Sequence, residues 1–194
     1  MLMNTGDEIV ESKNGLVSTI GIAADGKISY ALEGSIFAAG STMNWLRNNM
    51  GIISSVSESA QPATSINDNE GCYFVPAFAG LGAPWWDPHA RGIVCGLTGA
   101  SSRATIVRAA CESMAYQSYD VIERLSVDGG ASRNEFIMQF QADLLDIPVL
   151  QCETVETTAI GAAYLAGLAV GYWEDLEELE QNAQIVKIFH PHMS

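Results

Sequence analysis

The sequence predicts an α/β domain in which a mixed β-sheet is flanked by helices. Two extended segments joined by a short turn lie near the start of the chain, and from residue 103 onward helical and extended segments alternate. This order is typical of a mixed sheet whose faces are covered by helices. Residues 51–102 interrupt the order, and we expect them to be an inserted segment with an irregular course.

The first fifty residues are expected to supply three strands and one helix. Residues 16–23 and 27–32 are rich in β-branched and apolar side chains, and Ala24-Asp25-Gly26 between them is a turn sequence, so we expect a hairpin. Residues 1–4 are expected to add an earlier strand to the same sheet. Between residues 35 and 50 apolar residues recur at helical spacing: Ile36, Phe37, Met43, Leu46 and Met50.

The inserted segment is expected to contain one strand and an ordered loop. Residues 51–71 are polar and indicate a short surface helix and loop, whereas residues 72–78 form a strand-like apolar run. Residues 79–99 are interrupted by Gly and Pro, which exclude regular structure. Because Trp85 and Trp86 carry large apolar rings, we expect both to be buried, as a structural plug in preference to a ligand contact.

Helices and strands alternate in the second half of the chain. We expect helices at residues 103–124, 134–145 and 157–170, and strands at residues 125–128 and 148–152. The last helix consists largely of small residues, and each of its two Gly costs about 1 kcal/mol against Ala. We therefore expect it to pack closely against a neighbouring helix or a ligand. The whole order matches, by analogy of architecture, the ribonuclease H-like half-domain of actin and hexokinase.

Composition and charge narrow the classes of function. The 194 residues include 9 Lys plus Arg and 23 Asp plus Glu, a net charge of −14. This charge disfavours binding to nucleic acid or to an anionic membrane surface. No apolar run reaches the ~20 residues that span a bilayer, and no signal peptide is visible. We expect a cytoplasmic protein.

The cysteines and histidines do not indicate a metal site. The four cysteines lack the spacing of a zinc or redox pair and are expected to be core residues in a reducing compartment. His190 and His192 lie in a Pro-containing segment that we expect to be a solvated tail.

The most informative motif is Val-Asp-Gly-Gly-Ala-Ser-Arg-Asn at residues 127–134. An apolar residue closes a strand, Gly129 and Gly130 turn the chain, and an amphipathic helix begins near Asn134. Gly lets a ligand approach the backbone, and a helix start offers free N–H groups to a phosphate. The alternative interpretation is an ordinary Asp-Gly turn with Asn134 as an N-cap, and the motif alone does not decide between the two.

Three longer segments resemble the FGGY family of carbohydrate kinases. Residues 30–37, Tyr-Ala-Leu-Glu-Gly-Ser-Ile-Phe, resemble the start of the family's nucleotide-side helix. Residues 74–88, Phe-Val-Pro-Ala-Phe-Ala-Gly-Leu-Gly-Ala-Pro-Trp-Trp-Asp-Pro, resemble its central loop in the form found in members that act on glycerol, and residues 90–98 continue it. Residues 157–167, Thr-Thr-Ala-Ile-Gly-Ala-Ala-Tyr-Leu-Ala-Gly, resemble its last core helix. The resemblance covers nearly the whole chain.

The resemblance implies a kinase that uses ATP and Mg²⁺ to convert glycerol to glycerol 3-phosphate. In this family the polyol and the catalytic aspartate belong to an N-terminal domain. We therefore expect residues 1–194 to be the C-terminal nucleotide-binding domain, with no catalytic or metal-binding residue of its own. The chain alone is expected to be inactive, and the full-length enzyme is expected to be a homo-oligomer.

The resemblance also implies five cofactor-binding residues. Gly40 is expected to lie against the nucleotide, and Asn44, one helical turn on, to reach it with an amide where the family more often has Gln. Gly130 matches the glycine that contacts the phosphates, and Gly129 shapes the turn. Asn134 matches the residue that contacts the adenosine part, and it can also cap its helix.

Several parts of the family pattern have no counterpart in the sequence. The family's Gly-Thr-Gly phosphate turn would precede Met1, and its final helix would follow His190. Roughly ten further family residues would stand between about Glu123 and Val127. In addition, Thr105 stands where the family often has a His or Asn-type residue.

Two other classes of protein also use a Gly-rich turn to bind a nucleotide. A non-catalytic ATP-binding or regulatory module of the actin-like ATPase superfamily would use the Asp-Gly-Gly turn but not the central loop, so the loop favours the kinase. A dinucleotide-binding oxidoreductase needs its Gly-rich turn after the first strand. Here the Gly pair comes late in the chain, which argues against that function.

Overall fold

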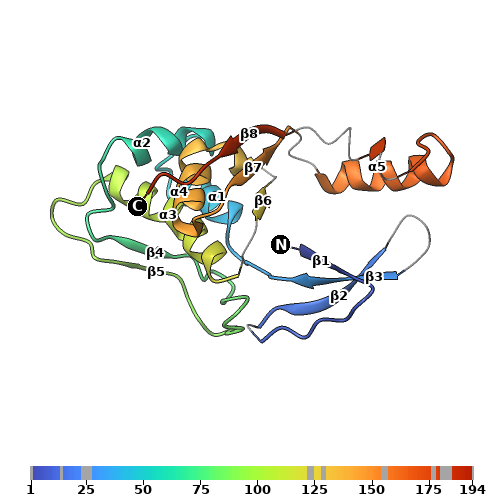
Figure 1. Cartoon of the computed structure of the whole chain (residues 1–194). Helices are drawn as coiled ribbons and strands as arrows, with labels where there is room; N and C mark the ends of the chain where they lie inside the picture. Colours follow the sequence, from blue (N-terminus) through green and yellow to red (C-terminus); the bar gives the residue numbers. More distant parts are fainter. Residues whose placement is uncertain are drawn as a thin grey trace.

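The computed structural model describes residues 2–13, 15–22, 28–121, 125–127, 130–153, 157–175, 178–179 and 185–193. It has the predicted mixed α/β character, with small sheets arranged around a group of helices (Figure 1). The strand orders within the described part are β1-β3-β2, β4-β5 and β6-β7-β8. The N-terminal strands thus form a sheet of their own, separate from the mixed sheet near the C-terminus.

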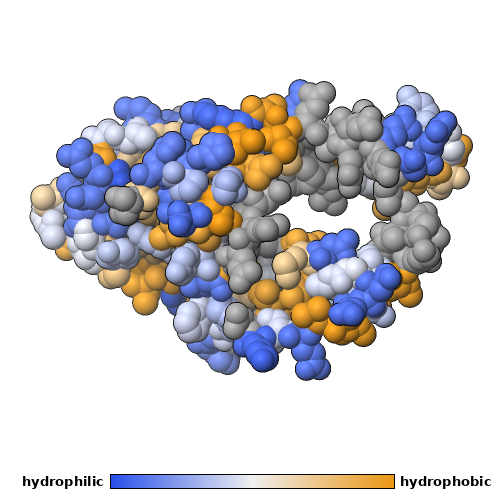
Figure 2. Space-filling view, viewed as in Figure 1, coloured by the Kyte–Doolittle hydropathy of each residue, from blue (hydrophilic) through white to orange (hydrophobic). Residues whose placement is uncertain are grey.

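The N-terminal sheet consists of β1 (Leu2–Gly6), β2 (Val17–Ile22) and β3 (Ile28–Glu33). The middle strand is β3, which runs antiparallel to both neighbours, so the predicted hairpin and the earlier strand are confirmed. The turn between β2 and β3 lies outside the described residues. Figure 2 shows apolar surface over this sheet. Its exposed apolar side chains include Leu2, Met3, Val17, Ile20 and Ile28.

Helices enclose the main core. These are α1 (Gly40–Asn48), η1 (Ser57–Ser59), α2 (Ala60–Thr64), α3 (Arg103–Tyr119) and α4 (Glu135–Leu145). The central element is α3, because it contacts α1, α2 and α4. Buried apolar side chains from these helices and from the loop after α1 form one cluster that includes Met43, Leu46, Ile53, Val107, Met114 and Ile137.

Both long core helices begin at polar caps that the sequence supplies. The hydroxyl of Ser102 accepts a hydrogen bond from the N–H of Thr105, and Oγ1 of Thr105 accepts one from the N–H of Ser102. This reciprocal capping box fixes the start of α3 at the predicted residue, Arg103. The helix ends at Tyr119, earlier than the predicted residue 124, and residues 122–124 lie outside the described part.

A second antiparallel pair lies in the inserted segment. Strand β4 (Tyr73–Val75) pairs with β5 (Ile93–Cys95), with Tyr73 opposite Cys95 and Val75 opposite Ile93. The prediction that residues 79–99 have no regular structure is therefore wrong at β5. A strand of three residues has too few positions to show alternation, and its pairing partner is distant in the sequence.

The mixed sheet consists of β6 (Leu125–Val127), β7 (Val149–Cys152) and β8 (Ile185–Phe189). Strands β6 and β7 are parallel, as two strands joined through a helix are expected to be, and β8 is antiparallel to β7. The sequence did not predict β8. In addition, Nε2 of Gln139 donates to the carbonyl of His190, at 2.8 Å, and the N–H of His192 donates to Oδ1 of Asp143, at 2.7 Å.

These bonds attach the terminal segment to α4, so the prediction of a solvated tail is wrong for its backbone. The two His side chains themselves are exposed. Within the described residues no group of three or more His, Cys, Asp or Glu side chains is placed to hold a metal ion.

The central loop is ordered, but its tryptophans are not buried. The N–H of Leu81 donates to the carbonyl of Asp87, and the N–H of Trp86 donates to that of Gly82, both at 2.8 Å. Trp85 is nevertheless 64% exposed and Trp86 42% exposed, so the expected burial is wrong. The loop is held by backbone hydrogen bonds and close backbone contacts: a Cβ at Gly82 would lie 2.1 Å from the carbonyl oxygen of Ser35.

The small-residue helix α5 (Thr157–Ala169) stands to one side of the core (Figure 1). A Cβ at Gly161 would meet no described atom within 4 Å, so the expected close packing is wrong at this position. Gly167 does have a close neighbour, because a Cβ there would lie 2.0 Å from the Trp173 ring. Among the residues described, no helix is both long and apolar enough to cross a membrane.

Candidate nucleotide site

Gly40 and Asn44 lie one turn apart on the outer face of α1. The opposite face of the helix is buried through Thr42, Met43 and Leu46, which fixes how the helix is rotated. Asn44 is exposed, and a Cβ at Gly40 would meet nothing within 4 Å in the described part of the chain. The helix therefore presents an open surface at Gly40 with a side-chain amide beside it.

The first turn of α1 is suited to a negative group. No side chain of the described residues caps this end, and the first turn contains no acidic residue. The N-cap is Ala39, whose carbonyl accepts the N–H of Thr42, at 2.9 Å. Since the first N–H groups of a helix lack partners within the helix, and the helix dipole is positive there, this end of α1 favours an anion.

Asn134 is buried, and both the oxygen and the nitrogen of its amide are hydrogen-bonded within the protein. Its Oδ1 accepts hydrogen bonds from the N–H groups of Phe136, at 3.0 Å, and Ile137, at 3.3 Å. Its Nδ2 donates to the hydroxyl of Ser59, at 2.7 Å. The N-cap interpretation is therefore confirmed, and the contact with an adenosine group stays a prediction. Because the side chain is buried, the direct role of Asn134 in the structure is to fix the start of α4.

The Gly pair falls at the edge of the described residues. Gly129 lies outside them, and Gly130 opens a short 3₁₀ helix, η2 (Gly130–Arg133), that leads directly to Asn134. The carbonyl of Ser132 accepts a hydrogen bond from Nε2 of Gln151 on β7, at 2.5 Å. This bond ties the end of the turn to the sheet. The phosphate contacts expected at Gly129 and Gly130 stay predictions.

The structure links the two halves of the predicted site through the core. Met43 and Leu46 of α1 share the buried cluster with Ile53 and with Ile137 of α4. The sequence did not single out Ser59, which bonds Asn134 across 75 positions. Residues 51–71 looked like polar surface, and no local pattern marks one serine among them as buried.

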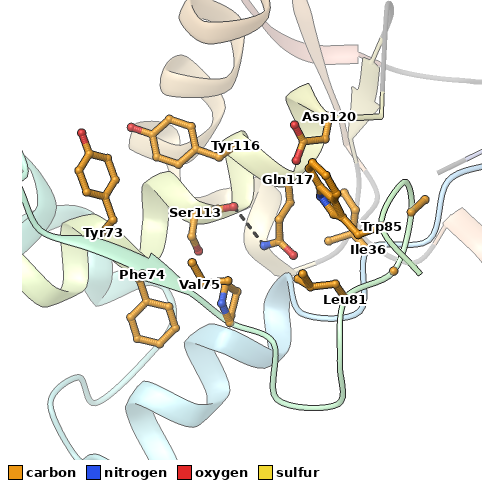
Figure 3. Close-up of a pocket in the computed structure, with 13 residues that line it drawn as sticks. Ile36, Tyr73, Phe74, Val75, Leu81, Trp85, Ser113, Tyr116, Gln117 and Asp120 are labelled. Atoms are coloured by element: carbon orange, nitrogen blue, oxygen red, sulfur yellow. Dashed lines mark hydrogen bonds between the residues drawn. The ribbon is translucent and has the colours of Figure 1, made fainter. Parts of the chain in front are cut away.

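A separate cavity lies beside α3. Its volume is about 210 Å³, and its lining includes Val75, Leu81, Trp85, Tyr116, Gln117 and Asp120 (Figure 3). Nε2 of Gln117 donates to the carbonyl of Ser113, at 3.1 Å. Burial raises the pKa of Tyr116 to about 12, so its phenol is neutral at physiological pH. Of the predicted site residues that the structure describes, none lines this cavity.

Comparison with known proteins identifies the family. The model of the C-terminal domain of the FGGY family of carbohydrate kinases matches residues 1–170. The chain belongs to the FGGY family. This result confirms the resemblance that the segments at residues 30–37, 74–88 and 157–167 indicate.

Relatives of this FGGY chain include several bacterial enzymes. It is 52% identical to glycerol kinase 1 of Clostridium tetani, and also to a glycerol kinase of Caldanaerobacter subterraneus, over 204 aligned positions. Both alignments cover 100% of the chain and 41% of the relative. The chain therefore spans about two fifths of the length of the curated relatives it matches. The alignments are longer than the 194 residues of the chain, which agrees with the expectation that some family residues have no counterpart here.

Solved structures of other kinases share the fold. The structure of Plasmodium falciparum glycerol kinase with ADP superposes with a TM-score of 0.86 at 36% identity, covering 100% of this chain and 41% of that one. A xylulose kinase from Lactobacillus acidophilus superposes with a TM-score of 0.71 at 24% identity, which shows the fold alone. The predicted fold class, a ribonuclease H-like α/β domain, is thus confirmed.

Proposed function

We propose that this chain is the ATP-binding half of a glycerol kinase, an enzyme that transfers the γ-phosphoryl group of ATP to glycerol. The observation that carries the proposal is the 52% identity to glycerol kinases along the whole chain. Residues 1–194 are then one nucleotide-binding domain with an insertion at about residues 51–102. The polyol site and the catalytic aspartate belong to the remainder of the full-length protein, which we expect to be a cytoplasmic homo-oligomer.

The described geometry supports a nucleotide near the outer face of α1. The open space at Gly40 accepts a flat ring, and the exposed amide of Asn44 both donates and accepts hydrogen bonds. The N–H of Gly130 would donate to a phosphate oxygen, and Gly129 would shape the turn that aims it. Asn134 holds the start of α4 in place beside that turn.

Charge compensation for the phosphates has to come largely from a bound cation. The chain has a net charge of −14 and only 9 Lys plus Arg. Mg²⁺ normally binds through substrate phosphates and a few carboxylates, with several waters. We therefore expect Mg²⁺ to enter with ATP, and neither a metal ligand nor a general base for glycerol to come from this chain.

Calorimetry with ADP and MgATP tests the binding half of the proposal. The 194-residue chain is expected to bind both, and Gly130→Asp is expected to weaken binding at least about tenfold because a carboxylate would face the phosphates. Gly99→Asp is the matched control: it adds the same charge at an exposed glycine with open space around it. Equal affinities for wild type and Gly130→Asp would overturn the phosphate assignment.

A coupled assay tests the catalytic half of the proposal. Phosphoryl transfer requires positioning and charge stabilisation of both reacting groups, so this chain alone is expected to give no glycerol 3-phosphate above background. Turnover of glycerol by the purified chain would show that the reaction does not need the remainder of the relatives' length.

A further inference from the structure

Three polar side chains meet inside the core where η1, α3 and α4 converge. Ser59, Cys111 and Asn134 are each essentially inaccessible to solvent. The hydroxyl of Ser59 donates to the carbonyl of Val56, at 2.6 Å, and accepts from Nδ2 of Asn134, at 2.7 Å. Burial raises the pKa of the Cys111 thiol to about 12, and a hydrogen bond with Ser59 opposes part of that rise.

These hydrogen bonds hold the Asn134 side chain in a single orientation. Its Oδ1 is committed to the N–H groups of Phe136 and Ile137, and its Nδ2 has the Ser59 hydroxyl as a partner. A buried amide that loses its acceptor pays the full cost of desolvation, so the Ser59 bond selects one orientation of the side chain. That orientation sets where α4 begins and where the preceding turn, residues 130–133, is held.

We propose that Ser59 is a positioning residue for the nucleotide site: its hydroxyl fixes Asn134, and through Asn134 the start of α4 and the turn at Gly130. The inference rests on the proposed nucleotide-binding function. It assigns a role to the inserted segment, because the segment that follows α1 supplies the partner that orders the phosphate turn. The buried hydrogen bond joins η1, which follows α1 in the chain, to the N-cap of α4.

Ser59→Ala removes the acceptor and leaves the Asn134 amide unpaired. The turn then samples other arrangements, and only the molecules that keep the correct arrangement bind ADP. The apparent dissociation constant for ADP therefore rises in inverse proportion to the fraction of such molecules. We expect a rise of about fivefold or more, measured by calorimetry on the 194-residue chain. Ser57→Ala is the matched control, since Ser57 is in the same short helix but exposed, and its affinity should stay within about twofold of wild type.

Two further variants separate positioning from loss of stability. Leu32→Val removes buried apolar volume on β3, outside the core cluster that contains Cys111 and Ile137, and is expected to lower stability without changing ADP affinity. Ser59→Cys keeps a weakly polar atom in place, so its affinity is expected between those of wild type and Ser59→Ala. If Ser59→Ala does not fold, Ser59→Cys decides, and an unchanged affinity in it overturns the inference.

The outcomes distinguish this inference from the proposed function. A wild-type chain that does not bind ADP overturns the proposed function and the positioning role with it. A wild-type chain that binds ADP while Ser59→Ala binds equally well overturns only the role of Ser59. NMR supplies an independent readout: the amide signals of Phe136 and Ile137 should shift in Ser59→Ala and stay in place in Leu32→Val.

Discussion

Arg108 and Glu112 form a buried ion pair one turn apart on α3, with 2.8 Å between Nε and Oε1. The two side chains are only 13% and 4% exposed. Arg108 also donates to the carbonyls of Ala63 and Ile66, and Glu112 accepts from Nδ2 of Asn69. The pair therefore joins α3 to the end of α2 and to the loop before β4.

Removing one member of this pair leaves the other charge buried without its partner. We expect Arg108→Met to lower the free energy of unfolding by about 3–5 kcal/mol, measured by urea denaturation followed by circular dichroism. Arg103→Met is the control, because its ion pair with Glu58 is solvent-accessible and should contribute far less to stability. Equal losses in the two variants would contradict the structural role of the buried pair.

The fold could be predicted wherever the sequence carries a local signal. Ser102 and Asn134 mark the starts of α3 and α4, and both caps are present in the structure. Strand β8 has no such signal and owes its conformation to pairing with β7, some 35 positions earlier in the chain. Long-range pairing of this kind cannot be recognised from the composition of a single segment.

In the candidate site, too, only the features that have a local signal could be predicted from the sequence. Gly40 and Asn44 could be placed on one helix face from their spacing alone, and the structure puts them on the outer face of α1. The Asn134–Ser59 bond could not be foreseen, because it joins segments that only the tertiary fold brings together. For Trp85 and Trp86 the sequence led us to expect burial, whereas both rings are exposed, since large apolar side chains do not have to be buried.

Two glycines of α5 should respond in opposite ways to the same substitution. Gly161→Ala adds a methyl group where the described structure has open space, so the helix should gain about 1 kcal/mol from the better propensity of Ala. Gly167→Ala places its Cβ 2.0 Å from the Trp173 ring, which packs against Tyr164, and should destabilise α5 by about 1–3 kcal/mol.

Hydrogen exchange of the α5 amides measures both effects locally. Protection should increase in Gly161→Ala and decrease in Gly167→Ala, and the fluorescence of Trp173 should change only in the latter. A gain of protection in Gly167→Ala would mean that Trp173 moves aside at no cost.

Lowering the pH should weaken the hydrogen bonds and the ion pair that Glu58 of η1 makes with Ser54 and Arg103. Hydrogen bonds from Ser54, followed by the Arg103 ion pair, lower the pKa of Glu58 from 4.5 to about 2. A carboxyl group whose pKa is lower in the folded state stabilises the fold above its unfolded pKa and loses that contribution as pH falls through the folded pKa. We therefore expect the stabilisation from Glu58 to be complete above about pH 4.5 and to disappear by about pH 2.

Melting temperatures of wild type and Glu58→Gln across this range test the expectation. The difference between the two proteins isolates Glu58 from the other carboxyl groups that titrate over the same range. That difference should narrow steadily between pH 4.5 and 2. A difference that stays constant through the window would show that Glu58 is not held in the ionised form by Ser54 and Arg103.

Asn44 offers a substitution that should improve the proposed site. The side chain is exposed on the face of α1 that carries Gly40, and Gln would extend the same amide by one methylene toward a ligand there. We expect Asn44→Gln to bind ADP about two- to fivefold more tightly, and Asn44→Ala to bind it more weakly, because one neutral hydrogen bond contributes about 0.5–1.5 kcal/mol. Gln also favours the helix slightly more than Asn, so stability should not fall.

Asn48→Gln is the control, since it makes the same chemical change at the end of α1, two turns from Gly40. If Asn48→Gln and Asn44→Gln raise the affinity equally, the gain comes from helix propensity, and Asn44 does not contact the nucleotide.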